Sequence, residues 1–142
     1  MSQRNPRTSP RPRTMAAGSP CPCGRPESYG DCCGRLHSGT AAASTAEQLM
    51  RSRYSAFAVG DRDYLLRSWH PRTRPSDLDL DARTQWVRLE ILSTGEGTPF
   101  HNEGTVAFRA VYRENGREGE LVEHSRFLRH DGAWVYLDAL PE

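Results

Sequence analysis

The apolar residues between positions 45 and 60 recur at the spacing of an α-helix. They form one face suited to burial, which comprises Ala46, Leu49, Met50, Tyr54 and Phe57. Thr45 and Gln48 make a capping box at the start of this segment, and Gly60 stands where a helix commonly ends in a left-handed residue. The pattern therefore predicts one helix over residues 46–59.

A second, shorter helix is predicted directly after the first. Asp61 can cap its start, and the segment through Trp69 must stop before Pro71, because the residue before a proline disfavours helical geometry. Residues 71–84 are polar and rich in proline and aspartate, so we expect a loop there.

Beyond residue 84 the apolar period falls to two, which indicates β-strands. The apolar positions are Val87, Leu89 and Ile91 in a first strand, and Val106, Phe108, Ala110 and Tyr112 in a second. Asn115-Gly116 predicts a hairpin turn into a long strand through Arg129, and Asp131-Gly132 predicts another turn into a last strand over residues 134–138. Helices followed by an antiparallel meander make an α+β fold, compatible with a curved sheet wrapped on a helix.

The composition describes one domain of ordinary size. Of 142 residues, 36% are hydrophobic and 26% are charged, which allows a modest core within a polar surface. No apolar run approaches the ~18 residues needed to cross a bilayer, and no secretory signal is evident, so we expect a cytoplasmic protein without membrane association. The net charge of +1, from 19 basic and 18 acidic side chains, argues against a body that binds nucleic acid.

The start of the chain differs from the rest in charge. Residues 1–14 contain four arginines, three prolines and no acid, with no large apolar residue after Met1. Such a segment cannot offset its own ordering entropy, so we interpret residues 1–16 as a disordered tail. An arm that contacts RNA or acidic lipid is the alternative, and Met15 is a second candidate start of translation.

All four cysteines, Cys21, Cys23, Cys32 and Cys33, lie within a stretch of thirteen residues. A reducing compartment does not maintain disulfides, so this cluster indicates a metal site. Four thiolates suit tetrahedral zinc, with Zn–S distances of ~2.3 Å, and the glycines nearby can adopt the positive φ angles of tight metal loops. The segment is therefore a candidate zinc-binding module.

Three alternatives to this zinc site stay open. Cys32 with Cys33, or Cys21 with Cys23, could form a regulatory disulfide. Four thiolates also hold iron–sulfur clusters. In the third alternative His37 replaces one cysteine of the vicinal pair, although we interpret His37 as an ordinary loop histidine.

The cysteine run resembles a known zinc-binding module. Cys21-Pro-Cys23-Gly24 followed by Cys32-Cys33-Gly34 is similar to the SEC-C motif, named for the C-terminus of the preprotein translocase SecA. The whole stretch from Cys21 to Asp138 resembles the YchJ family of bacterial proteins, through MRSRYSAF at 50–57, Asp63-Tyr64-Leu65, Trp69-His70-Pro71, Ser125-Arg126-Phe127, Gly132, Trp134, Tyr136 and Asp138. The resemblance implies zinc bound by the four cysteines and a following domain of the nuclear-transport-factor-2-like (NTF2-like) cone fold. It implies no reaction, because the family has no established one.

One charged residue interrupts the apolar face of the first predicted helix. Arg53 lies at the centre of that face, and a buried guanidinium needs partners. Glu123 and Asp138 on the predicted strands are candidates. Two interpretations stay open: a buried arginine–carboxylate tie between helix and sheet, or an arginine at the mouth of a cone pocket that binds an anionic ligand.

The candidate members of such a pocket are Arg53, Trp69, His70, Glu123, Arg126, Tyr136 and Asp138. In a small pocket enzyme, His70 or His124 with Glu123 and Tyr136 could serve as acid and base. Glu123 and His124 are adjacent in a strand and point to opposite faces, so both cannot enter one pocket without a bulge.

The sequence thus predicts a disordered tail at 1–16, a SEC-C-like zinc module at 17–38 and a cone-like, cystatin-like α+β domain at 39–142. We interpret the zinc as structural, since four protein ligands leave no open position for water. The expected function is binding of a protein or small-molecule partner. A small isomerase or hydrolase acting on an anionic substrate is the second candidate, and salt-dependent RNA binding through the tail is the third.

Overall fold

The computed structural model describes residues 15–141, so most of the predicted tail lies outside the described residues. The elements follow the order η1 (Tyr29–Asp31), α1 (Cys33–Ser38), α2 (Ala46–Val59), α3 (Arg62–Arg67), β1 (Gln85–Glu96), β2 (Glu103–Glu114), β3 (Arg117–His130) and β4 (Ala133–Ala139). The strands form one antiparallel sheet in the order β1-β2-β3-β4, which confirms the predicted α+β fold. Among the helices described, none has the length and apolar character to cross a membrane.

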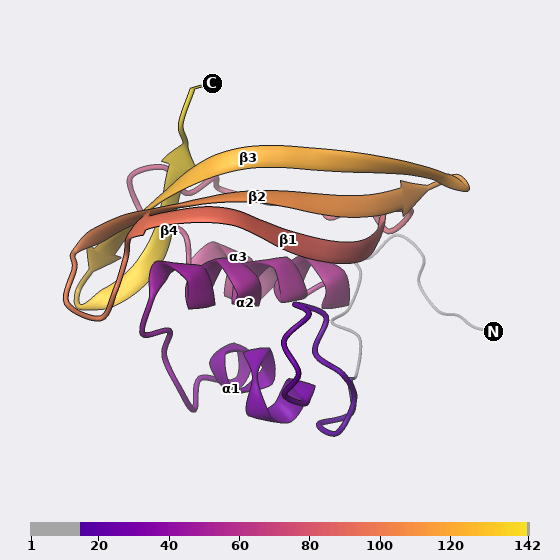
Figure 1. Ribbon diagram of the computed structural model, residues 1–142, viewed down its shortest axis with the longest axis horizontal. Helices are drawn as coiled ribbons and strands as arrows, with labels where there is room; N and C mark the ends of the chain where they lie inside the picture. The colour runs from indigo at the N-terminus through magenta and orange to yellow at the C-terminus, as the bar shows by residue number, and fades with distance from the viewer. Residues whose placement is uncertain (1–14, 142) are drawn as a thin grey trace.

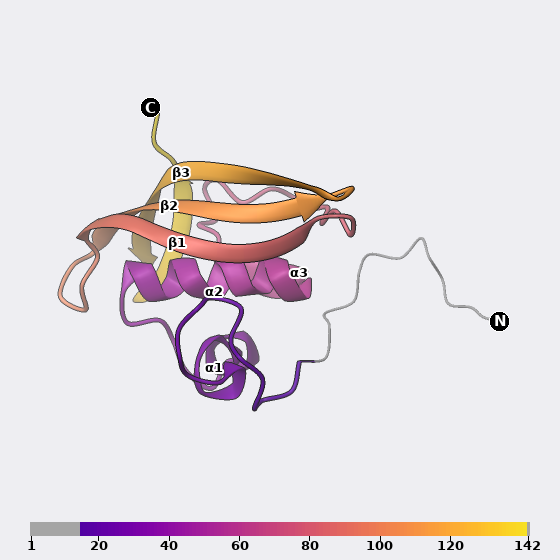
Figure 2. The same ribbon diagram turned by 45° about the vertical axis from the view of Figure 1, so that its right-hand side comes forward.

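Helix α2 lies in the middle of three layers. The curved sheet covers one side of it, and the cysteine-containing segment with α1 lies on the opposite side (Figure 1). Figure 2 shows the same order of layers after rotation. The sheet-side core contains Leu49, Met50, Tyr54, Val106, Phe108, Phe127 and Trp134, and a second cluster joins Leu36 of α1 to Ala56, Tyr64 and Leu65. Helix α2 therefore buries two faces, where the apolar pattern predicts one.

The second buried face of α2 is hidden from the pattern because small polar residues form much of it. Ser52 and Ser55 have no exposed surface, and the hydroxyl of Ser52 donates to the carbonyl of Leu49 at 2.7 Å. This hydrogen bond satisfies the hydroxyl within the helix itself, so a serine can pack where an apolar residue is expected.

The ends of α2 lie where the sequence predicts them. Thr45 Oγ1 accepts a hydrogen bond from the backbone nitrogen of Gln48 at 3.0 Å, and Gly60 ends the helix with a φ of 79°. The reciprocal half of the capping box differs from the expectation, since Gln48 Oε1 accepts from the backbone nitrogen of Ser44 at 2.7 Å. This contact fixes the orientation of the Gln48 amide.

Helix α3 is shorter than predicted. It ends at Arg67 instead of continuing through Trp69, because the main chain turns to pair with β4. The backbone nitrogen of Tyr136 donates to Ser68 O at 2.8 Å, and that of His70 donates to Tyr136 O at 2.7 Å. These hydrogen bonds attach the end of α3 to the edge of the sheet.

Both predicted hairpin turns are confirmed. Asn115 and Gly116 have φ angles of 53° and 77°, and Asp131 and Gly132 have φ angles of 52° and 84°. Two successive positive φ angles are the geometry that matches the twist of two-residue hairpins.

One of the apolar positions in β1 faces outward. Val87 is 38% exposed, because the register with β2 shifts between Trp86 and Arg88. The irregularity turns Trp86 toward the core instead, where its ring centroid lies 6.0 Å from that of Tyr54. Such a bulge re-aims side chains in a way that strict alternation does not predict.

Two glycines let the β1–β2 hairpin close on the start of α2. Gly97 O accepts a hydrogen bond from the backbone nitrogen of Ala46 at 2.9 Å. A Cβ atom on Gly104 would overlap the backbone of Gly97, so only glycine fits there.

Candidate metal centre and its surroundings

The N-terminal segment brings the four cysteines together. Cys21 and Cys23 lie in the loop before η1, Cys32 follows η1, and Cys33 begins α1. Their Sγ atoms all lie within 4.8 Å of one another, and all four are free thiols. Three are buried and Cys32 is partly exposed, so the cluster forms a small sulfur-lined core.

The spacing of the sulfur atoms fits one tetrahedral metal ion. Four ligands at ~2.3 Å from a tetrahedral centre lie ~3.8 Å apart. The Sγ atoms of Cys23 and Cys32 are 3.6 Å apart, and within residues 15–141 no histidine or carboxylate joins the group. A cluster of several irons holds its thiolates farther apart than a single ion does. The donor set therefore suits a closed site for one metal ion.

The electrostatics of the cluster also favour a cation. Burial, aided by the charge of Cys23, raises the pKa of Cys32 to about 12. Hydrogen bonds from Cys23 and Cys33 lower the pKa of Cys21, while hydrogen bonds with Cys21 and Cys23 raise the pKa of Cys33. The thiols of Cys32 and Cys33 therefore resist ionisation, and a divalent cation would stabilise their thiolates as the protons leave.

The cysteine cluster is attached to the second face of α2. Arg51 Nη1 donates to the carbonyl of Cys23 at 2.8 Å, and Cys21 Sγ lies 3.7 Å from the hydroxyl of Ser55. Arg51 points away from the sheet, and its partner there is the cysteine segment. Loss of the module would therefore uncover this face of α2.

His37 makes a second link between the module and α2. It lies in α1, and both ring nitrogens are engaged: Nε2 lies 2.9 Å from Ser52 O and Nδ1 lies 2.6 Å from the hydroxyl of Tyr29. Because a carbonyl only accepts, Nε2 carries the proton and Nδ1 accepts from Tyr29. The ring centroid also lies 4.7 Å from that of Tyr64. The interpretation of His37 as an ordinary loop residue is thus wrong, and it does not belong to the sulfur group.

We expect His37 to make folding sensitive to mildly acidic pH. Burial lowers the pKa of His37 in the folded chain below the ~6.5 of an unfolded histidine. Between these two pKa values the unfolded chain binds more protons, so the free energy of unfolding falls as pH drops below ~6.5 and is independent of this group above that pH. His37→Gln keeps a donor and an acceptor but cannot titrate.

Urea denaturation of both proteins at pH 7.5 and 5.5 measures this effect. At pH 7.5 we expect His37→Gln to lower the free energy of unfolding by about 1 kcal/mol through lost ring contacts. The wild type should then lose more stability than the variant on going to pH 5.5. Protonation of the thiols affects both proteins alike. If the wild type and His37→Gln lose the same free energy of unfolding between pH 7.5 and 5.5, His37 is not the group responsible.

Arg53 is buried as predicted, but its predicted partners are wrong. It is 4% exposed, and Nη1 donates to Leu65 O at 2.8 Å and to Ser68 Oγ at 2.7 Å. The guanidinium carbon lies 5.0 Å from the Trp69 ring centroid and 4.8 Å from that of Tyr136. Burial lowers the pKa of Arg53 to about 10, so it stays charged at neutral pH. The guanidinium ties α2 to the end of α3 and to β4.

The two carboxylates proposed as partners of Arg53 have other contacts. Asp138 makes a bidentate pair with Arg126, at 3.0 and 2.8 Å. Glu123 Oε2 accepts from Ser125 Oγ at 2.6 Å and from the Tyr136 hydroxyl at 3.2 Å. Burial and the charge of Glu123 raise the pKa of Tyr136 to about 12.

The structure does not assemble the predicted acid–base group. His70 lies beside His130 with ring centroids 5.0 Å apart, and His124 is exposed. Glu123 and His124 therefore do point to opposite faces, as the strand pattern predicts. Of the predicted pocket residues, Arg53, Trp69, Tyr136 and Glu123 form one connected group, whereas Arg126 and Asp138 pair with each other.

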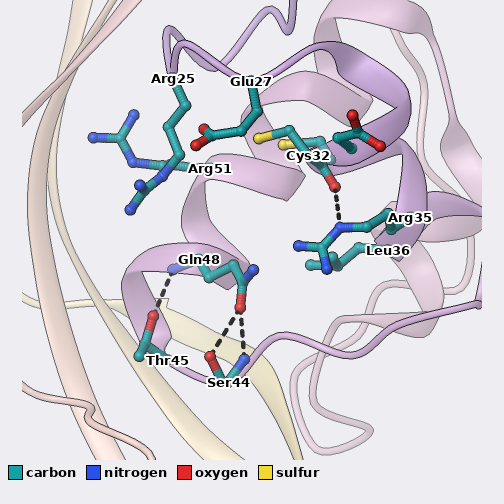
Figure 3. Close-up of a pocket in the computed structure, with 11 residues that line it drawn as sticks. Arg25, Glu27, Cys32, Arg35, Leu36, Ser44, Thr45, Gln48 and Arg51 are labelled. Atoms are coloured by element: carbon teal, nitrogen blue, oxygen red, sulfur yellow. Dashed lines mark hydrogen bonds between the residues drawn. The ribbon is translucent and has the colours of Figure 1, made fainter. Parts of the chain in front are cut away.

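A cavity of about 370 Å³ lies between the cysteine module and the start of α2 (Figure 3). Its lining consists of Arg25, Glu27, Asp31, Cys32, Cys33, Arg35, Leu36, Ser44, Thr45, Gln48 and Arg51. The sequence pattern does not reveal this cavity, since it forms only where the two segments pack. The nearest sequence signal is the set of arginines on either side of the cysteines.

A family model and several bacterial proteins match this chain. Residues 45–139 match the model described as YchJ, middle NTF2-like domain. The chain is 66% identical to a UPF0225 protein of Streptomyces coelicolor over 84% of this chain and 93% of that protein. It is 52% identical to a UPF0225 protein of Corynebacterium glutamicum over 84% and 94%.

Two solved structures share the fold. The solution structure of RPA3114, a SEC-C motif containing protein from Rhodopseudomonas palustris, is 33% identical, with a TM-score of 0.75 over 86% of this chain and 98% of that one. The crystal structure of a SEC-C motif containing protein from Psychrobacter arcticus is 27% identical, with a TM-score of 0.69 over 86% and 83%. The similarity therefore includes both the cysteine segment and the sheet.

Proposed function

This chain belongs to the YchJ family of UPF0225 proteins, and we propose that it is a binding protein in which Cys21, Cys23, Cys32 and Cys33 hold one structural zinc ion. The observation that carries the proposal is the set of four sulfur atoms within 4.8 Å of one another. Zinc bound by four thiolates has no open position, so it stabilises a fold and activates no water. Free thiols in such a cluster are also typical of a reducing, cytoplasmic compartment.

The role of the zinc in this proposal is to hold residues 17–38 against α2. The module contributes few large apolar residues, and its buried cluster consists mainly of the cysteines with Tyr29. Such a small segment gains most of its folding free energy from the metal. The contacts of Arg51 with Cys23 and of His37 with Ser52 then place a zinc-held surface beside the start of α2.

Metal content per chain tests the proposal. Protein purified without added metal should contain about one zinc ion per chain by elemental analysis, as expected for four ligands around one centre. Its thiols should stay unreactive until a chelator or a denaturant is added. A metal-free chain with four reactive thiols or with disulfides would overturn the proposal and favour redox chemistry.

A small enzyme that uses the cone-side group is the second candidate. One observation favours it: the buried Nε1 of Trp69 has no hydrogen-bond partner within the described part of the chain. The Trp69 ring lies beside Arg53 and Tyr136, and the Tyr136 hydroxyl contacts the carboxylate of Glu123. An anionic substrate bound at this group would have a donor and a cation beside it. A thermal-shift screen of small anions tests whether this group binds an anionic substrate. An anion that stabilises the wild type and Glu123→Gln, but not Trp69→Phe, supports this candidate.

A further inference from the structure

The cavity beside the zinc module contains a hydrogen-bond donor whose orientation is determined. Gln48 Oε1 accepts from Ser44 N at 2.7 Å and lies 3.1 Å from Ser44 Oγ. A backbone nitrogen only donates, so the amide oxygen must occupy that side and Nε2 must face the other way. Gln48 lines the cavity, and Figure 3 shows its amide group at the edge of the open space.

Arg35 brings a second set of donors to the same cavity. Its Nε donates to the carbonyl of Cys32 at 3.3 Å, which anchors the guanidinium next to the cysteine cluster. Within residues 15–141 neither of its Nη groups has a hydrogen-bond or ion-pair partner. The guanidinium points into the cavity in Figure 3. The two Nη groups of Arg35 and the Nε2 atom of Gln48 are therefore hydrogen-bond donors in the cavity that have no acceptor among the described residues.

The other charges limit what can bind. The lining has three guanidiniums and two carboxylates, and the cysteines of the metal centre form one wall. Arg51 pairs with Glu47 at 2.9 Å and with the Cys23 carbonyl, and Arg25 lies 3.7 Å from the same Glu47 carboxylate. Within residues 15–141, Arg35 is thus the lining guanidinium without an acidic partner. The carboxylates and thiolates repel multiply charged ligands such as nucleic acid. A ligand with one negative charge fits this balance.

We propose that this cavity binds the carboxylate group of a small organic acid, with Arg35 Nη groups and Gln48 Nε2 as its donors. A planar carboxylate can accept two parallel hydrogen bonds from the arginine fork, and the amide supplies a third. A volume of about 370 Å³ is enough for a small molecule. The inference rests on the proposed function, because the zinc-held module positions Arg35.

Titration of the zinc-loaded, 15N-labelled chain with acetate tests the site. We expect saturable shifts of the Gln48 side-chain amide and the Arg35 Nε–H signals, beyond those caused by sodium chloride at equal ionic strength. Gln48→Glu keeps the acceptor for Ser44 but replaces the free donor by a negative oxygen. Arg35→Gln removes the cation. Each variant should weaken acetate binding at least about tenfold, since a hydrogen bond to a charged group is lost.

The control variant is Arg117→Gln, which removes an exposed arginine at the start of β3, far from the cavity in sequence and in the fold. It should bind acetate as the wild type does. Equal acetate binding by the wild type, Gln48→Glu and Arg35→Gln would overturn the proposed site. Phosphate binding as tight as acetate binding at pH 7.5 would also overturn it. A wild-type chain that holds one zinc ion yet shifts no more with acetate than with chloride refutes this site alone, whereas a chain without zinc refutes the proposed function.

Discussion

Replacement of Cys23 by serine is expected to release the proposed zinc ion and to unfold the N-terminal module. Cys23 has no exposed surface, its Sγ lies 3.6 Å from that of Cys32, and its carbonyl accepts from Arg51. Structural zinc contributes ~10–16 kcal/mol of apparent binding free energy at pH 7, so loss of one of four ligands should weaken zinc binding by about 100- to 1,000-fold.

Elemental analysis and circular dichroism together measure this outcome. The sheet and α2 share a core without the cysteines, so the strand signal of the Cys23→Ser protein should persist while its zinc content falls. Ser38→Ala, an exposed substitution at the end of α1, should keep its zinc. If Cys23→Ser retains one zinc ion per chain at wild-type affinity, Cys23 is not a ligand.

Replacement of Arg53 by alanine is expected to lower the free energy of unfolding by about 3 kcal/mol. The substitution removes two hydrogen bonds, leaves Leu65 O without its strong donor, and opens a void between the rings of Trp69 and Tyr136. Buried large-to-small substitutions cost ~2–5 kcal/mol, and unsatisfied buried acceptors add to that. The effect should appear as a lower urea midpoint with an unchanged slope.

The matched comparison is Arg126→Ala. Arg126 also makes two hydrogen bonds, but it is 40% exposed and pairs with Asp138 on the surface, where ion pairs contribute little. If Arg53→Ala does not fold, Arg53→Met keeps most of the volume and allows the measurement. Equal urea midpoints for the wild type and both Arg53 variants would show that the guanidinium is not a structural tie.

Much of the fold was predictable because short-range contacts specify it. The ends of α2 follow from Thr45 and Gly60, which act on neighbouring backbone groups. The hairpin turns follow from Asn115-Gly116 and Asp131-Gly132, whose residues accept positive φ angles at little cost. The candidate metal ligands were predictable for the same reason, since four cysteines so close in sequence can reach one centre.

Predictions of which residues contact one another in the folded chain were less successful. The position of Arg53 indicated burial, but its acceptors come from the end of α3, where the helix stops earlier than predicted. Val87 belongs to the apolar positions of the first strand, yet the register shift in β1 exposes it. His37 carried no sequence signal of its role, because Tyr29 and Ser52 become its partners only after the module docks.

Local sequence was thus sufficient for the types and order of the elements, the two hairpins and the four candidate ligands, because each depends on residues close together in the chain. Contacts between distant segments settled the rest: the second buried face of α2, the surroundings of Arg53, and the cavity that brings Arg35 to Gln48. These features arise from how three layers pack on one helix, and packing geometry is set by all the contacting surfaces together. No propensity or period within a single segment contains that information.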